Sequence, residues 1–366
     1  METISENEYF MSGGVSGKMT RLIDVAKYAQ VSINTVSRVI NNAQYVAKDK
    51  RERVLKAIAE LNYVPNESAR RLKSYHLKKT VSKQTFNIGC IVFSKMKFSD
   101  PYYSLILDGI DREVIRQKYN LNFIYTFEQI NNDPTILINM INPEKVDGII
   151  FIHPLNTEDN RKIVEKIKMK FKSIVFVDTL YDENVDCIDV DKFQAGYDAV
   201  KYLVGLGHKR IGFIGETESS DDLRYKGYLM GITDFGLEYD KNIIEGKNIG
   251  YGIEEGYTCM KRILDRTQLL PTAIFAASDR TAIGVMRAIT EKQLKIPDDI
   301  SVIGFDNLPE SQNITPTLTT FGVKKDELGI LAVRKLLERI KNPETSPSKT
   351  ILPVELIIRN SCKTIK

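Results

Sequence analysis

The stretch VSINTVSRVINN, residues 31–42, combines side chains that can read hydrogen-bonding groups with a stripe that can only pack. Val36 and Val39 recur at helical spacing and place one face of a short helix against a core. The other face presents Asn34 and Arg38 among small polar residues. The amide of an Asn and the fork of a guanidinium match the paired hydrogen-bonding groups on base edges in a DNA groove.

Two further short helices are predicted around this stretch. An apolar stripe in LIDVAKYAQ predicts a helix before it, Ser32 is suited to cap the second helix, and a third helix is expected from about Lys48 to Leu61. Three short helices with a tight turn between the first two are typical of a helix-turn-helix, whose second helix enters the major groove. The alternative is a three-helix module that binds a protein.

The charge distribution favours nucleic acid as the partner of this region. Residues 19–80 carry 13 Lys or Arg against 5 Asp or Glu, whereas residues 81–366 are nearly neutral. A basic segment beside a nearly neutral one indicates an anionic partner for the basic part alone, although an ordinary basic surface would look similar. We expect Arg38 to bond a guanine, Asn34 an adenine, and Ile33 to touch a thymine methyl. Phosphate contacts are expected from Ser32, Ser37 and Asn41.

These motifs carry a resemblance to a known family. DVAKYAQVSINTVSRVIN, followed by VLKAIAELNYVPNESARRL, resembles the DNA-binding head of the lactose-repressor/galactose-repressor family of bacterial transcription regulators, from about Thr20 to Leu72. One departure is Gln30, where the family usually has Gly, and a non-Gly residue in a left-handed turn costs about 1–2 kcal/mol. The resemblance makes residues 65–72, PNESARRL, a hinge helix in the minor groove, with Leu72 wedged between base steps. It adds phosphate contacts from Ser68, Arg70, Arg71 and Lys73.

The residues and the resemblance together imply one DNA-binding set. Its members are Leu22, Ser32, Ile33, Asn34, Thr35, Ser37, Arg38, Asn41, Tyr45, Asn66, Ala69, Leu72 and Lys73.

From Phe86 onward, apolar runs alternate with amphipathic helices. The runs NIGCIVF, LNFIYTF, VDGIIFI, SIVFVD, RIGFIG, TAIFAAS and ISVIGFD predict buried parallel strands. Alternating β and α segments predict doubly wound α/β layers. Because about 280 residues are long for one such sheet, we expect two lobes with a cleft between them. The predicted class is therefore α + α/β: a three-helix head and hinge helix, then a two-lobed doubly wound domain.

The family resemblance continues through DPYY, LGHKRIGFIG, ASDRTAIGVMRAI, IPDDISVIGFD and PTLTT. It implies a fold like the periplasmic sugar-binding proteins, with strands crossing between lobes near residues 190, 323 and 351, and an effector of the galactose or galactoside type. The expected domains are a disordered arm or cloning remnant (1–18), the DNA-binding domain (19–64), the hinge helix and linker (65–85) and the effector-binding and dimerisation domain (86–366). The N-lobe is expected at about 86–190 and 323–350, and the C-lobe at about 191–322 and 351–366.

Candidate effector-binding residues follow the predicted strands, where ligands of such sheets bind. Asp178 and Asp306 end two strands, and the resemblance implies Arg224 as an effector-binding Arg and Tyr251 as a stacking aromatic. The full predicted set is Tyr102, Tyr103, Asp178, Arg224, Tyr251, Ser278 and Asp306. Asp279 is expected to cap the following helix, and His208 to be structural. Ile152 stands where relatives can carry a sugar-binding Asn, and neighbouring His153 could replace it.

The sequence argues against several other classes of protein. No G-x-G-x-x-G follows a first strand, and no Walker loop, G-x-S-x-G or metal-ligand spacing is present, so no enzyme, cofactor, metal or catalytic residue is predicted. Four scattered cysteines and the lack of a signal peptide or long apolar segment indicate a cytoplasmic protein away from membranes. The resemblance implies that this protein is bacterial and acts at the nucleoid. The expected partners are palindromic double-stranded operator DNA, a small sugar effector and a second copy in a homodimer. A phosphorylated protein corepressor or an unregulated sugar receptor are the alternatives.

Overall fold

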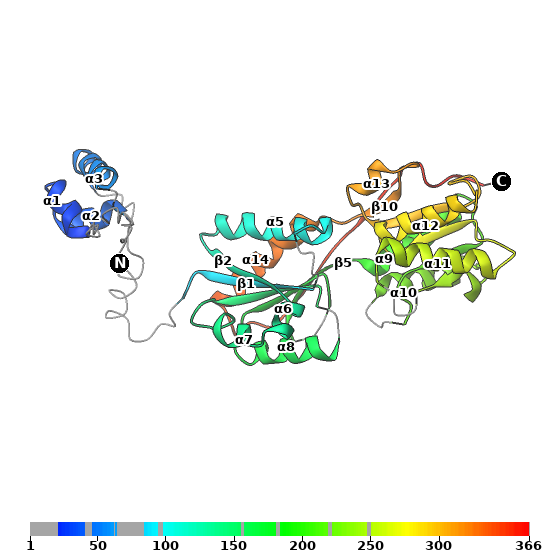
Figure 1. The fold of residues 1–366 in the computed structure, drawn as a ribbon, viewed down its shortest axis with the longest axis horizontal. Helices are drawn as coiled ribbons and strands as arrows, with labels where there is room; N and C mark the ends of the chain where they lie inside the picture. The colour runs from blue at the N-terminus through cyan, green and yellow to red at the C-terminus, as the bar shows by residue number, and fades with distance from the viewer. Residues whose placement is uncertain are drawn as a thin grey trace, which may run out of the picture. The chain divides into compact units, whose positions relative to one another are not determined.

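The chain divides into two compact units, residues 1–82 and 83–366. The structure, a computed structural model, describes residues 21–40, 46–61, 63, 84–93, 98–154, 157–180, 184–218, 222–246 and 250–365 (Figure 1). The two units are described separately below.

The first unit contains the three predicted helices. They are α1 (Leu22–Tyr28), α2 (Ile33–Ile40) and α3 (Lys48–Glu60). Their apolar stripes meet in a small core of Val25, Ala26, Ala29, Val36, Val39, Val54 and Ala57. The core is built from the short aliphatic residues that the sequence placed at helical spacing, so the helix-turn-helix prediction is confirmed.

The second unit contains two six-stranded sheets. The first has the order β11-β5-β4-β3-β1-β2, and every neighbouring pair in it is parallel. Its strands are β1 (Asn87–Val92), β2 (Asn120–Thr126), β3 (Gly148–Ile152), β4 (Ile174–Val177), β5 (Asp186–Val190) and β11 (Lys349–Leu352). The second has the order β12-β10-β9-β8-β6-β7, in which only β12 runs antiparallel to its neighbour. Its strands are β6 (Ile211–Ile214), β7 (Ile244–Glu245), β8 (Ala273–Ala276), β9 (Ser301–Asp306), β10 (Thr319–Gly322) and β12 (Glu355–Ile357).

We call the first sheet with its helices the N-lobe and the second the C-lobe. The N-lobe helices are α5 (Pro101–Arg116), α6 (Phe127–Asn132), α7 (Thr135–Asn139), α8 (Glu158–Lys168) and α14 (Lys325–Lys341). The C-lobe helices are α9 (Lys192–Gly205), α10 (Leu223–Asp234), the 3₁₀ turn η1 (Lys241–Ile243), α11 (Ile253–Arg266), α12 (Asp279–Glu291) and α13 (Glu310–Asn313). The two-lobed, doubly wound prediction is therefore confirmed.

The chain crosses between the lobes three times. It passes from β5 into α9, from β10 into α14, and from β11 into β12. Helix α14 packs against α5 of the N-lobe, and this approach requires glycine, because a Cβ at Gly109 would lie 2.1 Å from the carbonyl oxygen of Asp326. At each crossover the chain thus leaves a strand of one lobe and enters a helix or strand of the other lobe.

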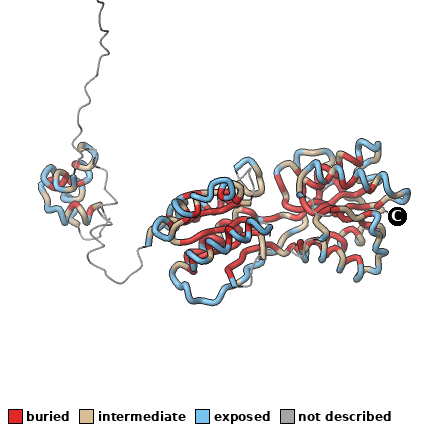
Figure 2. The backbone as a smooth tube through the Cα atoms, turned by 60° about the horizontal axis from the view of Figure 1, so that its bottom comes forward, coloured by how far each residue is buried: buried red, intermediate tan, exposed pale blue. Residues whose placement is uncertain are grey.

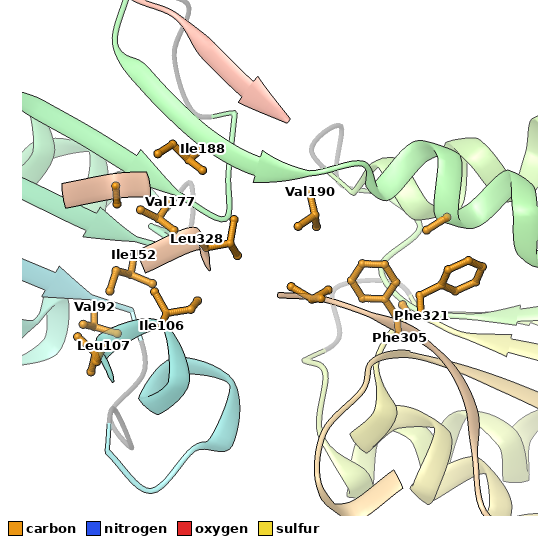
Figure 3. Packing of buried hydrophobic residues seen from close by; sticks show 14 of the residues in the cluster. Val92, Ile106, Leu107, Ile152, Val177, Ile188, Val190, Phe305, Phe321 and Leu328 are labelled. Atoms are coloured by element: carbon orange, nitrogen blue, oxygen red, sulfur yellow. The ribbon is translucent and has the colours of Figure 1, made fainter. Parts of the chain in front are cut away.

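Buried residues follow the strands, and exposed residues lie on the outer faces of the helices (Figure 2). The largest apolar cluster draws on both lobes. Figure 3 shows Val190, at the end of β5, between the N-lobe side chains on one side and Phe305 and Phe321 of the C-lobe on the other. Apolar packing at the crossovers therefore supports the polar residues that follow the strands.

Candidate functional site

The exposed face of α2 carries the residues predicted to read bases. Ile33 is 40% exposed, Asn34 and Arg38 are also exposed, and Val39 on the opposite face is buried. Ser32 caps the helix as predicted, since its Oγ accepts a hydrogen bond from the backbone N–H of Thr35 at 3.2 Å. The helix thus presents an amide, a guanidinium and an apolar tip on one side.

The turn between α1 and α2 depends on a residue in the left-handed region. Gln30 has φ of 51°, and the next amide, of Val31, donates back to the carbonyl of Ala26 at 3.0 Å. This is the helix-ending geometry in which glycine is usual. The expected strain at Gln30 is therefore present.

Other predicted DNA-binding residues have different positions. Leu22 is half-buried against the core of the head, and Thr35 is half-buried with its hydroxyl 2.9 Å from that of Ser32. The hinge helix and nine predicted positions lie outside the described residues: Asn41, Tyr45, Asn66, Ser68, Ala69, Arg70, Arg71, Leu72 and Lys73.

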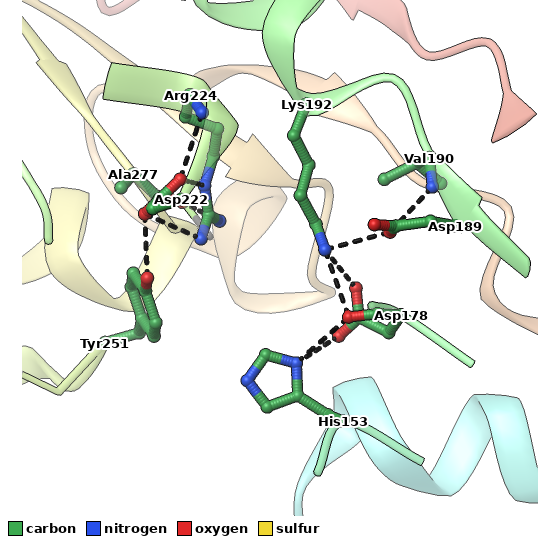
Figure 4. Close-up of polar contacts among 9 residues, drawn as sticks. All are labelled: His153, Asp178, Asp189, Val190, Lys192, Asp222, Arg224, Tyr251 and Ala277. Carbon is green, nitrogen blue, oxygen red and sulfur yellow. Dashed lines mark hydrogen bonds and ion pairs between the residues drawn. The ribbon is translucent and has the colours of Figure 1, made fainter. Parts of the chain in front are cut away.

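The second site lies between the lobes and begins with Arg224, in the first turn of α10. Its Nε and Nη2 donate to the two carboxylate oxygens of Asp222 at 2.9 and 3.2 Å, and its Nη1 donates to the carbonyl of Ala277 at 2.5 Å (Figure 4). The guanidinium lies over the ring of Tyr251, 4.7 Å from its centroid, and the Tyr251 hydroxyl donates to Asp222 at 2.7 Å. Although burial opposes ionisation, Arg224 holds the pKa of the Asp222 carboxyl below its usual range.

The guanidinium keeps binding capacity after these contacts. It has five N–H groups, and the three bonds above use three of them. Arg224 is thus fixed in orientation, and two of its N–H groups have no acceptor among the described residues.

The N-lobe side of the site is an ion-paired chain. His153 Nδ1 lies 2.8 Å from Asp178 Oδ2, and Lys192 Nζ lies 3.0 Å from Asp178 Oδ1 and 2.8 Å from Asp189 Oδ1 (Figure 4). Burial would raise the pKa of Asp178, but Lys192 and His153 hold it well below its usual range. An ionised Asp178 favours the His153 tautomer with its proton on Nδ1. The other ring nitrogen points away from Asp178, toward the side of Figure 4 where Tyr251 lies.

Asp306 differs from Asp178 in forming no ion pair with any of the described residues. It is 8% exposed, and no described residue donates a hydrogen bond to its side chain. Burial raises its pKa well above the usual range, although Lys325 lowers it. Such a group gains most from a ligand that donates a hydrogen bond to it.

The two tyrosines of α5 lie beside these groups: Lys325 Nζ is 5.7 Å from the centroid of the Tyr102 ring, and the centroids of the Tyr103 and His153 rings are 6.3 Å apart. Burial raises the pKa of Tyr102 first, and the charges of Asp178 and Asp306 raise it further. The same two carboxylates act on Tyr103. Six of the seven predicted effector residues therefore gather around the junction of the lobes.

The hydroxyl of the seventh, Ser278, is hydrogen-bonded within the protein. It caps α12 by accepting from the Thr281 amide at 3.1 Å, and its hydroxyl donates to the carbonyl of Tyr251 at 3.0 Å. The cap predicted for Asp279 was wrong: Asp279 is fully buried and accepts from the Leu308 amide at 2.7 Å and from the Thr320 hydroxyl.

Two other predictions concern residues near strands. His208 is structural as expected, with its ring nitrogens 2.9 Å from the Thr272 hydroxyl and 3.2 Å from the Lys363 carbonyl. Ile152 is fully buried in the apolar cluster, and the next residue, His153, is half-buried and bonded to Asp178.

The backbone is strained where these side chains emerge. His153, Asp178, Asp306 and Asn307 have φ of 48°, 62°, 115° and 53°. Each follows or ends a strand, and non-Gly residues in this region cost about 1–3 kcal/mol each. Clustered strain of this kind is typical of ligand-binding sites.

The structure adds four charged residues that the sequence argument missed: Asp189, Lys192, Asp222 and Lys325. Lys192 and Lys325 each follow a crossover strand within three residues, which is the signal that could have identified them. Asp222 lies two residues before Arg224 and caps α10. Among the described residues, no group of three acidic, His or Cys side chains is arranged to hold a metal ion.

Comparison with known proteins agrees with both units. Residues 21–66 match the model of bacterial regulatory proteins of the lacI family, and residues 200–362 match a periplasmic binding protein-like domain. The chain is 37% identical to the HTH-type transcriptional repressor PurR of Haemophilus influenzae (strain PittEE), over 95% of this chain and all of the relative. The corresponding repressor of Pasteurella multocida (strain Pm70) is also 37% identical, over 94% of this chain and 99% of the relative.

Two solved structures extend the comparison. The lac repressor dimer bound to operator and the anti-inducer ONPF has a TM-score of 0.76 at 29% identity, covering 94% of this chain and all of that one. The complex of the transcriptional regulator CelR with cellobiose has a TM-score of 0.66 at 25% identity, covering 93% of this chain and 99% of that one.

The head and the two-lobed domain therefore define a ligand-responsive class of DNA-binding regulator. The chain belongs to the lacI family of bacterial regulatory proteins and is a DNA-binding transcriptional repressor, not an enzyme. No helix within the described residues is long and apolar enough to cross a membrane.

Proposed function

We propose that this repressor binds a palindromic operator as a homodimer and releases it when a small uncharged sugar of the galactose or galactoside type binds between the lobes. The effector class is proposed because, among the described residues, two N–H groups of Arg224 have no hydrogen-bond acceptor and the Asp306 side chain has no hydrogen-bond donor. A sugar hydroxyl can accept from the first and donate to the second. Neighbouring hydroxyls on one ring can therefore satisfy both groups together.

The charge of the site supports an uncharged ligand. Two cations of the site are already paired with carboxylates, Lys192 with Asp178 and Asp189, and Arg224 with Asp222. A phosphorylated sugar would bring further negative charge among these carboxylates. The Tyr251 and Tyr102 rings supply apolar faces, which a pyranose or another flat ring can use.

The comparisons are compatible with a sugar, since one of the structures is a regulator in complex with cellobiose. The dimer is proposed because a two-fold operator matches a two-fold protein, and one lac repressor structure is a dimer on operator. Cytoplasmic action at the nucleoid follows from this role.

Fluorescence anisotropy tests the proposal. Labelled DNA from upstream of the protein's own gene is titrated with the protein, then with galactose, lactose or cellobiose, with galactose 1-phosphate as the charged control and purine bases as flat non-sugar ligands. Release by one neutral sugar, at a concentration that leaves DNA bound with the phosphate, supports the effector class.

The other outcomes are equally informative. Release or tighter binding with a purine base alone overturns the sugar assignment and keeps the site. Tight operator binding that ignores all of these ligands favours a protein corepressor. Repeating the titration at two salt concentrations separates base reading from phosphate contacts, because phosphate contacts weaken steeply with salt.

A further inference from the structure

Two buried lysines occupy matching positions at the crossovers. Lys192 is the first residue of α9, directly after the chain leaves β5, and Lys325 is the first residue of α14, after β10. Both are buried, with 8% and 4% exposure. Neither has a place in the proposed set of effector contacts.

Each lysine bonds to an aspartate of the opposite lobe. Lys192, on a C-lobe helix, donates to the backbone carbonyl of Asp178 at 3.1 Å, at the end of N-lobe strand β4. Lys325, on an N-lobe helix, donates to the backbone carbonyl of Asp306, at the end of C-lobe strand β9. The same contact is thus made twice, in opposite directions across the junction.

The aspartates need such support. Their φ values of 62° and 115° lie where side-chain-bearing residues are strained, so the surroundings must hold them. An ammonium bonded to the carbonyl fixes the peptide plane and with it the direction of the side chain. The contact also makes that direction depend on how the lobes are arranged, because donor and acceptor belong to different lobes.

The two contacts differ in charge balance. Lys192 is paired with the carboxylates of Asp178 and Asp189. Lys325 donates to two carbonyls, of Asp306 and Val323, and no carboxylate among the described residues forms an ion pair with it. Burial accordingly lowers the pKa of Lys325, whereas the two carboxylates raise that of Lys192 despite burial. The lysine that holds Asp178 is therefore paired with carboxylates before a ligand arrives, whereas the Asp306 carboxyl forms no ion pair with a described residue.

We propose that Lys192 and Lys325 are paired positioning residues, each holding from one lobe the aspartate that the other lobe presents to the effector. This rests on the proposed effector contacts of Asp178 and Asp306. It implies that effector affinity depends on both lysines although neither touches the ligand.

The first test needs no effector. Hydrogen–deuterium exchange of the full-length protein is compared for the wild type, Lys325→Met, Lys192→Met and the control Lys324→Met, whose exposed side chain adjoins Lys325. Lys325→Met should speed exchange about tenfold or more in peptides covering residues 301–308, as expected for losing one charge-assisted hydrogen bond. Lys192→Met should do the same for residues 174–180, and the control should change neither.

The second test uses operator release. Lys325→Met should require about tenfold more sugar for half-release, while its operator affinity without sugar stays within about threefold of the control. If Lys325→Met does not fold, Lys325→Arg, which keeps the cation and displaces the donors, should show the same local exchange and weaker release.

The outcomes separate the two proposals. Exchange at 301–308 equal to that of the control, or faster exchange spread over both lobes, overturns the positioning role whatever the sugar does. Local exchange as expected, in a protein that no sugar releases, overturns the sugar effector and leaves the positioning role standing.

Discussion

Breaking the Arg224–Asp222 pair should separate stability from effector binding. The two side chains are 9% and 2% exposed, and the guanidinium makes two contacts with the carboxylate, at 2.9 and 3.2 Å. Arg224→Met leaves a buried carboxylate whose remaining donors, among the described residues, are the Tyr251 hydroxyl and the residue 224 amide. Removing one partner of such a pair costs about 3–5 kcal/mol.

Asp222→Asn provides the compensating change. Asp222 Oδ1 accepts from the residue 224 amide at 3.0 Å and caps α10, and an Asn side chain can keep that cap without the charge. The double variant Arg224→Met/Asp222→Asn has no buried unpaired charge, so we expect it to regain at least about 2 kcal/mol over Arg224→Met alone. Effector affinity should stay about 10–100-fold below wild type in both, because the two ligand-facing N–H groups are gone.

Thermal unfolding followed by far-UV circular dichroism, together with the operator-release titration, measures both quantities. Arg224→Met should lower the Tm by about 6–15 °C, and the double variant by clearly less. A single variant within about 2 °C of wild type would refute the cost assigned to the buried charge. A double variant that regains sugar response would show that Arg224 acts only through stability.

Three further predictions follow from other parts of the chain. Arg38→Ala should weaken operator binding by about 1–3 kcal/mol and reduce the sequence preference at one base pair. Arg38→Lys should reduce that preference too, since it keeps the positive charge but loses the two-pronged guanidinium. Equal losses on random DNA in fluorescence anisotropy would contradict base reading by Arg38. Gln30→Gly should stabilise the head by about 1 kcal/mol in a thermal melt, because φ of 51° costs glycine little; no gain would mean that the turn is unstrained. Burial raises the pKa of Asp279 to about 7, so the folded protein keeps the carboxyl proton at a pH where the unfolded chain has lost it. The free energy of unfolding should therefore fall between about pH 4 and pH 7, by about 4 kcal/mol at most. Asp279→Asn should flatten that part of the stability-against-pH curve, and an unchanged curve would contradict the raised pKa.

The strands and helices that the sequence predicted best are those with strong periodicity. The run GIIFI of β3 is buried at every position, as expected for a strand covered on both faces, and the α2 stripe of Val36 and Val39 enters the core of the head. The crossover strands β10, β11 and β12 are short and only partly apolar, so periodicity alone did not define them. Their positions came from the family resemblance.

The sequence predicted individual residues of the candidate site but not the contacts among them. Asp178 and Asp306 were found because strand ends converge in parallel sheets, and that rule needs no knowledge of contacts. It does not reveal that Ser278 is used as a cap, or that Asp222 holds Arg224. Those outcomes depend on which partner lies within about 3 Å after folding, and residue type does not determine that.

The positive φ values at the strand ends connect the polar network of the site to the apolar core. His153, Asp178 and Asp306 directly follow or end strands whose preceding residues, Ile152, Val177 and Phe305, are almost fully buried. Such a strand can hold a strained residue at its end, because relaxing the strained backbone would pull the preceding buried side chain out of the core. The turn aims each polar side chain at the junction of the lobes instead of along the sheet. A ligand there meets groups whose orientation is set before it binds, so less of its binding energy is needed to order them. Asp178→Gly or Asp306→Gly would remove both the strain and the carboxylate, whereas Asp→Ala removes the carboxylate and keeps a residue that is strained at this φ. Sugar affinity that falls further in the Gly variant than in the Ala variant, at equal thermal stability, would measure the contribution of the backbone itself.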